Sequence, residues 1–170
     1  NTIVAVQAYE TILCSRTYTS LKEMSGQTIK IATWGDSPAI AKFIDALGAD
    51  NDVNFKVVPY GGSGDTVRGY LGKDADTIFT IQTKQAKVEV DGACFAFSAN
   101  GDLDFAFIDV ILSVNADEAA VNEYRQVVSD LAQTEAWDTA FAGTLTQVVN
   151  ADNAEALVKK VEAAVELNTQ

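Results

Sequence analysis

The sequence contains no histidine. Histidine is the commonest general base in enzymes and the commonest metal ligand in proteins. Its absence makes a Ser-His-Asp triad impossible and argues against zinc chemistry. We therefore expect no catalytic residue, no metal site and no cofactor in this chain.

Cysteine is scarce as well, because only Cys14 and Cys94 are present. Two thiols so far apart in the sequence fit neither a thiolate metal site nor a redox Cys-x-x-Cys motif. Each cysteine lies in an apolar run typical of a strand, which favours two buried thiols. A disulfide between the two strands is the alternative if the chain is exported.

Basic residues are also few, and long apolar runs are absent. The 170 residues include 12 Lys and Arg against 24 Asp and Glu, so the net charge is -12 and the pI is near 4.2. Nucleic acids and anionic membrane surfaces bind clustered cations, whereas the cations here are scattered. No apolar run reaches the roughly 18 residues of a membrane span, and the first residues lack the features of a signal peptide. We expect no nucleic-acid partner and no membrane insertion, in either a cytosolic or a mature exported protein.

The overall composition is typical of a globular protein. With 48% hydrophobic and 21% charged residues, the chain can bury one core or two small lobes. Strand-like and amphipathic runs alternate, which predicts an α/β fold with a mainly parallel sheet flanked by helices. The expected strands are 3–13, 28–33, 53–58, 75–81, 93–98, 105–114 and 145–149. The expected helices are a short one between Ser20 and Gly26, then 36–48, 65–71, 83–90, 117–131, 135–141 and 153–167.

The most informative stretch is 57–65, with the sequence VVPYGGSGD. An apolar run ends at Pro59, three glycines follow with Ser63 among them, and a helical pattern opens at Asp65. Such a loop binds anions, because glycines let main-chain N–H groups approach a ligand and the helix end adds roughly half a positive charge. The alternative is a simple turn, since glycine-rich strand-to-helix turns are common in α/β proteins.

A second strand-to-helix junction, 33–38, has the sequence TWGDSP. Consecutive parallel strands place such loops at one edge of the sheet, where ligands bind in α/β folds. The two loops are expected to hold a carboxylate through N–H groups and hydroxyls, while Asp36 and Asp65 cap their own helices. Trp34 and Tyr60 are candidates for packing on a ligand or on the core. The predicted ligand-binding residues are Thr33, Trp34, Gly35, Ser37, Tyr60, Gly61, Gly62, Ser63 and Gly64.

Several segments share their order and spacing with one known family. They are VVPYGGSG at 57–64, YLGKDAD at 70–76, LKEM at 21–24, the strand and helix start at 110–121, and the helix start at 150–157. Together they resemble the solute-binding receptors of tripartite tricarboxylate transporters, often called the Bug family. The loop at 33–38 stands where those receptors have their second ligand loop.

The resemblance implies a type II periplasmic binding protein with two lobes, one of them incomplete in this chain. Residues 16–100 are then the second, ligand-binding lobe, and 1–15 with 101–170 form a partial first lobe and the C-terminal helices. The family's N-terminal part is expected to precede Asn1. The implied function is capture of a small carboxylate in the periplasm, chiefly through main-chain amides, and its delivery to the subunits of a membrane transporter.

Two other functions stay open. One is a small phosphate-ester or acyl-transfer enzyme with Ser63 as nucleophile, although no histidine is present to activate it. The other is an interaction domain that keeps the fold but binds no ligand. In that case Trp34 fills the space between the two loops, and Asp36 repels an anion. The ligand, the transporter partner and the oligomeric state leave no signature in the sequence.

Overall fold

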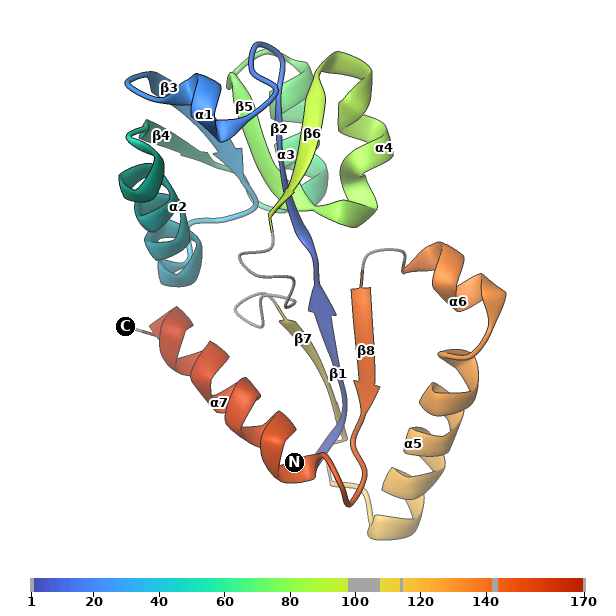
Figure 1. The fold of residues 1–170 in the computed structure, drawn as a ribbon. Coiled ribbons are helices and arrows are strands. Elements are labelled where there is room, and N and C mark those ends of the chain that lie inside the picture. Colours follow the sequence, from blue (N-terminus) through green and yellow to red (C-terminus); the bar gives the residue numbers. More distant parts are fainter. Residues whose placement is uncertain (1, 98–107, 114, 142–143, 170) are drawn as a thin grey trace. The chain divides into compact units, whose positions relative to one another are not determined.

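The computed structural model describes residues 2–97, 108–113, 115–141 and 144–169. The chain divides into two compact units. We call Glu10–Ala99 the central unit, and Asn1–Tyr9 together with Asn100–Thr169 the terminal unit. Figure 1 labels the elements of both units along the chain.

The central unit contains a five-stranded sheet in the order β4-β3-β5-β2-β6. Its strands are β2 Thr11–Ser15, β3 Thr28–Thr33, β4 Asn54–Pro59, β5 Thr77–Ile81 and β6 Ala93–Phe97. β3 pairs in parallel with both β4 and β5, whereas β2 pairs antiparallel with β5 and β6. The α/β class is confirmed, but parallel pairing is limited to β4, β3 and β5. Those three strands are joined through helices α2 and α3, the kind of crossover that parallel neighbours require.

The central unit's helices are α1 Leu21–Met24, α2 Pro38–Asn51, α3 Ser63–Leu71 and α4 Gln85–Val88, with 3₁₀ turns at Gln82–Lys84 and Glu89–Asp91. Neighbouring residues of β5 point to opposite faces of the sheet. Ile78 packs in a buried cluster with Val67 and Tyr70 of α3. Phe79 stacks on Phe43 of α2 with ring centroids 4.9 Å apart. Helices α2 and α3 therefore cover opposite faces of the sheet.

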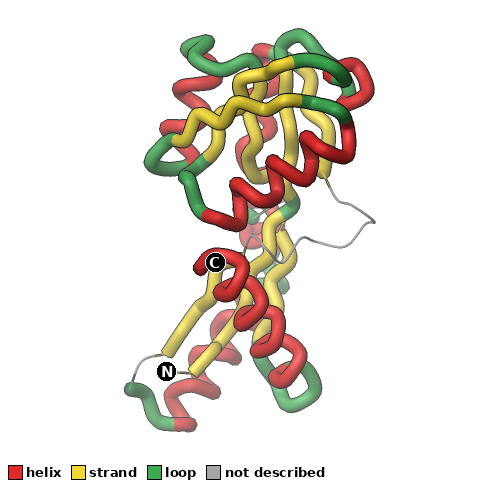
Figure 2. Tube along the Cα trace, turned by 90° about the vertical axis from the view of Figure 1, so that its left-hand side faces the viewer, coloured by secondary structure: helices red, strands yellow, loops and turns green. Residues whose placement is uncertain are grey.

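The terminal unit contains an antiparallel three-stranded sheet in the order β7-β1-β8. Its elements are β1 Thr2–Tyr9, β7 Ile108–Ser113, α5 Glu118–Leu131, α6 Glu135–Ala140, β8 Thr144–Val148 and α7 Ala154–Thr169. Val6, Val149 and Leu157 form its buried cluster. Figure 2 shows helices beside the strands of each unit. Among the described helices, none is long and apolar enough to cross a membrane.

Two of the predicted elements are wrong in their extent. The single strand expected over 3–13 is two strands in two different sheets, β1 and β2, separated at Glu10. A continuous β-rich run does not reveal which sheet each half joins. The helix expected to end at Gly48 continues to Asn51, so Gly48 is an interior residue of α2. Glycine is required there for close packing, since a Cβ would lie 2.6 Å from the Val53 carbonyl oxygen.

Some predicted boundaries fall outside the described residues. These are the strand ends at Ser98, 105–107 and Val114, and the lobe boundary at Asn100. The remaining expected strands and helices are present, with ends shifted by a few residues. The last expected helix, for example, is α7 and continues to Thr169.

Cys14 and Cys94 form a disulfide. The two residues are direct partners in the antiparallel ladder of β2 and β6, with their Cα atoms 4.0 Å apart. The favoured interpretation of two buried thiols is wrong, and the alternative is correct. Register placed the two sulfur atoms together, and register between distant strands is not visible in the sequence.

Removing this disulfide is expected to destabilise the protein. For a loop of 80 residues, the chain-entropy model gives a loss of about 4 kcal/mol in the free energy of unfolding. Urea unfolding of the wild type with and without dithiothreitol measures this loss. The double variant Cys14→Ser, Cys94→Ser is the control, because dithiothreitol should not change it further. An unchanged wild-type midpoint in dithiothreitol would contradict the assignment.

Candidate functional site

The carboxyl ends of β3, β4 and β5 meet at one edge of the central sheet, because the three strands are parallel. Thr33 at the end of β3 is level with Pro59 at the end of β4. Just beyond, the Tyr60 N–H donates to the Thr33 carbonyl oxygen at 2.9 Å. The two loops singled out in the sequence are thus joined by a backbone hydrogen bond.

The first loop uses its own hydroxyl groups to hold its shape. The Thr33 hydroxyl is buried and donates to the Gly35 carbonyl oxygen at 2.8 Å. Gly35 has a φ of 122°, a conformation that favours glycine. The Ser37 hydroxyl caps α2 by accepting from the Ile40 N–H at 3.3 Å. The prediction that Asp36 caps this helix is wrong, since Ser37 is the N-cap and Asp36 is exposed.

Trp34 packs back against the sheet. Its ring stacks on Phe79 with centroids 4.9 Å apart and an interplanar angle of 23°. Phe79 in turn is fully buried between Trp34 and Phe43 of α2. The indole therefore has a packing role on the α2 side of the sheet.

The second loop is shorter than predicted. Helix α3 begins at Ser63 with Gly62 as its N-cap, so Ser63 and Gly64 lie in the first helical turn. Gly62 provides no side-chain cap, and its carbonyl accepts from the N–H and the hydroxyl of Thr66 at 3.0 and 2.9 Å. The first N–H groups of a helix have no partner within the helix. The start of α3 therefore presents backbone donors, with its positive dipole end, at the sheet edge.

Asp65 is the third residue of α3, so the prediction that it caps the helix is wrong. Its carboxylate pairs with the guanidinium of Arg68 on the next turn. The Arg68 side chain is 80% exposed. The pair places a positive charge beside Asp65 and weakens its repulsion of an anion at the helix start.

The Tyr60 ring extends along α3. A side chain at Gly69 would collide with this ring, so Gly69 is the position that lets the ring lie flat on the helix. The Tyr60 hydroxyl donates to Asp74 Oδ2 at 3.4 Å. Burial raises the pKa of Tyr60 above its usual value of 10.0, and the charge of Asp74 raises it further. The backbone of Tyr60 belongs to the loop junction, while its phenol lies at Gly69 of α3 and packs against the buried cluster that contains Val67 and Tyr70.

The end of β5 adds two polar residues that the sequence analysis did not include. Thr80 is fully buried, and Gln82 follows the strand. Within the part of the chain that the structure describes, Thr80 Oγ1 and Gln82 Oε1 are buried and have no hydrogen-bond partner. The third parallel strand, β5, is the feature of the sequence that could have pointed to them. It ends in polar residues at the same sheet edge, although no glycine loop follows it.

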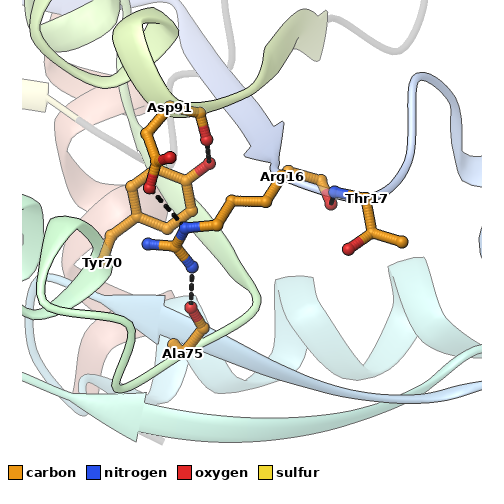
Figure 3. A network of polar contacts seen from close by, with 6 residues as sticks. Arg16, Thr17, Tyr70, Ala75 and Asp91 are labelled. Atoms are coloured by element: carbon orange, nitrogen blue, oxygen red, sulfur yellow. Dashed lines mark hydrogen bonds and ion pairs between the residues drawn. The ribbon is translucent and has the colours of Figure 1, made fainter.

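A polar network holds α3 at the opposite end of the helix (Figure 3). The Arg16 guanidinium pairs with Asp91, donates to the Ala75 carbonyl at 2.6 Å and lies 4.1 Å from the centroid of the Tyr70 ring. The Tyr70 hydroxyl donates to the Asp91 carbonyl oxygen at 2.9 Å. Burial raises the pKa of Tyr70, Arg16 lowers it, and the Asp91 charge raises it again, with a net increase. The network connects α3 to β2, to the start of β5 and to the turn before β6.

Tyr70→Phe is expected to lower the free energy of unfolding by about 1–3 kcal/mol, because it leaves the Asp91 carbonyl without its partner. The raised pKa of Tyr70 adds stability that is complete below about pH 10 and is lost as the pH rises through the folded-state value. The alkaline loss should therefore be smaller in the variant. Urea unfolding between about pH 7 and 11 measures both effects.

Tyr124→Phe is the matched control for this prediction, because Tyr124 lies on α5 and is exposed. Its free energy of unfolding should equal that of the wild type throughout. Equal stability of Tyr70→Phe and Tyr124→Phe would show that the Tyr70 hydroxyl does not hold α3.

No family model and no curated protein matches this chain. Solved structures do match over nearly its whole length. A TctC solute binding protein from Polaromonas is 13% identical with a TM-score of 0.59, and covers 97% of this chain and 68% of its own. MatC from Rhodopseudomonas palustris, solved with bound malate, is 14% identical with a TM-score of 0.62, covering 98% and 69%. The alkanesulfonate-binding protein SsuA from Xanthomonas axonopodis pv. citri, bound to MOPS, is 14% identical with a TM-score of 0.53, covering 99% and 70%.

The chain therefore has the α/β fold of type II periplasmic binding proteins. It spans about two thirds of the length of the proteins it matches. At such low identity the likeness establishes the fold, while the function has to come from the site. Within the described ranges, no group of three or more His, Cys, Asp or Glu side chains is placed to hold a metal ion.

Proposed function

We propose that this chain belongs to an extracytoplasmic solute-binding receptor that captures a small carboxylate at the start of α3 and delivers it to a membrane transporter of the tripartite tricarboxylate type. The observation that carries the proposal is the set of glycines at the sheet edge. The sequence resemblance and the fold support the same function. Of the two proposed lobes, 16–100 and 1–15 with 101–170, the first holds the ligand, and β2 belongs with it because it pairs in the same sheet.

Three glycines at the start of α3 have no packing reason to be glycine. A Cβ at Gly62 or Gly64 would meet nothing within 4 Å, and at Gly61 it would be in ordinary contact, 3.6 Å from Asp65 Oδ2. None of the three has the positive φ that disfavours side chains. Glycine weakens helices and loops by increasing the entropy of the unfolded chain. Close approach of a ligand to the backbone explains why three of them occur here.

The site matches a carboxylate without a cationic side chain. Neither loop, 34–37 or 60–62, contains lysine or arginine. Backbone N–H groups at a helix start bind anions through hydrogen bonds and the helix dipole. Asp65, the acidic group of the first turn, is paired with Arg68. The ligand-binding residues proposed here are the nine named from the sequence, of which Gly61, Gly62, Ser63 and Gly64 contribute chiefly their backbone.

The two alternatives receive less support from the geometry. Ser63 is the first residue of α3, and the chain contains no histidine to accept its proton. The interaction-domain hypothesis relied on Trp34 filling the space between the loops and on Asp36 repelling an anion. The Trp34 ring stacks on Phe79 of β5, and Asp36 is exposed to solvent. Binding through the helix start is therefore preferred to both.

Wild-type protein is expected to gain thermal stability with one class of small carboxylate in a screen that also contains sugars and nucleotides. A ligand at a hundredfold excess over its Kd adds about 2.7 kcal/mol to the free energy of unfolding, which moves the Tm by several degrees. The same screen should be run on a chain extended at its N-terminus, because solute receptors use both lobes. No shift with any carboxylate in either form would contradict the proposal.

Gly62→Asp is expected to abolish carboxylate binding and to raise the Tm of the free protein. The new carboxylate caps α3, which adds a few tenths of a kcal/mol relative to glycine, and it occupies the donors that the ligand needs. Gly62→Ala is the comparison variant: its Cβ would stand where the ligand approaches but cannot accept from the helix donors, so it should weaken binding less than Gly62→Asp does. Titration calorimetry measures binding in both variants. Retained binding in Gly62→Asp would show that the donors at the helix start are not the site.

A further inference from the structure

A cavity lies within the terminal unit, between α5 and the turn that joins β8 to α7. Its volume is about 630 Å³, which is in the range of small-molecule sites. The carboxylate site proposed above belongs to the central unit, so this cavity is a separate place in the molecule. Helix α5 lines it with the side chains of Asn122, Arg125, Gln126 and Ser129.

These four residues form one stripe along the helix. They are spaced by three and four positions, which places them on the same face of α5. All four are polar, and one of them is a cation. The stripe therefore gives the cavity a polar wall with a single positive charge in it.

Arg125 carries that charge without a counter-ion. Its Nη1 donates to Asn122 Oδ1 and its Nη2 donates to the Ile3 carbonyl oxygen, each at 3.2 Å. Both acceptors are neutral. Its Nε is buried and has no hydrogen-bond partner among the described residues, and no ion pair to Arg125 occurs among them. Half-buried charges are normally compensated by an opposite charge, and here an anion in the cavity would provide it.

The other arginines of the chain show the contrast. Arg16 pairs with Asp91, and Arg68 pairs with Asp65. With 24 acidic residues in the sequence, a carboxylate partner for Arg125 would be easy to provide. The Arg125 side chain is instead fixed by neutral groups of two elements, α5 and β1, at the wall of a cavity. A cation fixed in this way is preorganised for a ligand.

The remaining polar groups of the cavity are mainly donors. Asn122 accepts from Arg125 through its Oδ1, and Asn150 accepts from the N–H groups of Asp152 and Asn153 through its own. Each asparagine thus keeps its NH₂ group for another partner. The Ser129 hydroxyl has no hydrogen-bond partner in the described ranges, and it can donate as well. Donors beside an uncompensated cation are the groups that bind an anion.

The start of α7 adds a favourable potential. Ala154, the first residue of this 16-residue helix, lines the same cavity. Its N–H already donates to the Asn150 carbonyl oxygen, so the helix contributes its dipole and not this hydrogen bond. The positive end of the dipole stabilises negative charge nearby.

The arrangement of these groups suits phosphate better than a carboxylate or sulfate. Donors from α5 and from the turn before α7 surround the cavity, and a tetrahedral anion accepts hydrogen bonds from several directions, whereas a carboxylate has two oxygen atoms in one plane. Gln126 provides the one different group. Its Nε2 donates to Asp130 at 2.8 Å, which leaves its amide oxygen as an acceptor. Such an acceptor suits the O–H of a protonated phosphate, and sulfate has no proton to offer.

We propose that the terminal unit binds a phosphate group in this cavity, either free phosphate or the phosphate of a small monoester. The Arg125 guanidinium provides the charge. Asn122, Ser129 and Asn150 donate hydrogen bonds, and Gln126 accepts one. This site goes beyond the proposed carboxylate receptor and does not depend on it.

The test is titration calorimetry of the wild type with inorganic phosphate, sulfate and glycerol 3-phosphate at about pH 6, where phosphates keep a proton and the chain has no histidine to titrate. Phosphate is expected to bind saturably and more tightly than sulfate. Arg125→Gln should weaken phosphate binding by about tenfold or more, because it removes a charged donor. Arg125→Lys keeps the charge without the planar fork and should recover part of the affinity.

Ser129→Asp is a second variant that leaves Arg125 and its two hydrogen bonds in place. Its carboxylate enters the cavity one turn from Arg125 and should abolish phosphate binding without lowering the Tm. Thr139→Asp is the matched control, because Thr139 is exposed on α6, lies outside the cavity lining and receives the same charge. It should bind phosphate as the wild type does.

The source of the phosphate follows from the same titrations. Tighter binding of glycerol 3-phosphate than of inorganic phosphate would support the site and assign it to a monoester. Equal or weaker binding would support the site and assign it to the free ion. In both cases Ser129→Asp has to remove the binding.

Other results would overturn the proposal. If millimolar phosphate does not bind the wild type saturably, or binds Ser129→Asp with unchanged affinity, then Arg125 only joins α5 to β1. Sulfate binding as tightly as phosphate, or a carboxylate such as succinate losing its binding in Ser129→Asp, would show that the ligand class is wrong. Carboxylate binding that is lost in Gly62→Asp and kept in Ser129→Asp belongs to the central unit, so the two proposals fail or succeed separately.

Discussion

The parallel register of β3 with β4 and with β5 is the constraint on which the central unit depends. It places the ends of three strands at one edge, and it requires the two crossover helices that cover the two faces of the sheet. The hydrogen bond from Tyr60 to Thr33 then joins the loops that follow β3 and β4. The start of α3 lies at this edge because the helix follows β4 after only a short loop.

Two groups of glycines in the central unit have different roles. Side chains at Gly48, Gly69 or Gly92 would meet neighbouring atoms at distances that real contacts do not reach, so these positions are glycine for packing. The positions from 61 to 64 have room for a side chain and no backbone strain. The first group supports the fold, and the second leaves backbone donors open. This contrast separates structural glycines from those assigned to binding.

The predictions from sequence succeeded where one segment carries its own signal. β3 was predicted with the correct ends, and β4 within one residue, because each is an apolar run bounded by turn residues. They failed where another residue or strand determines the structure of a segment. Asp36 and Asp65 looked like helix caps, yet Ser37 and Gly62 take those positions. The strand at 3–13 looked continuous, although its halves pair in different sheets. The two loops of the candidate site were proposed from glycines and hydroxyls, whereas Thr80 and Gln82 were not singled out.

The amino-acid sequence by itself determined the α/β class, the order of most elements, the lack of any histidine-based chemistry, and the glycine loop before α3. These follow from local composition and periodicity, which act within a few residues. Only the tertiary structure decided that Cys14 meets Cys94, that Arg16 holds Tyr70 and Asp91, and that the buried oxygens of Thr80 and Gln82 lack partners among the described residues. Each of these depends on which distant residues come into contact, and strand register, which sets those contacts, is not written in any single segment.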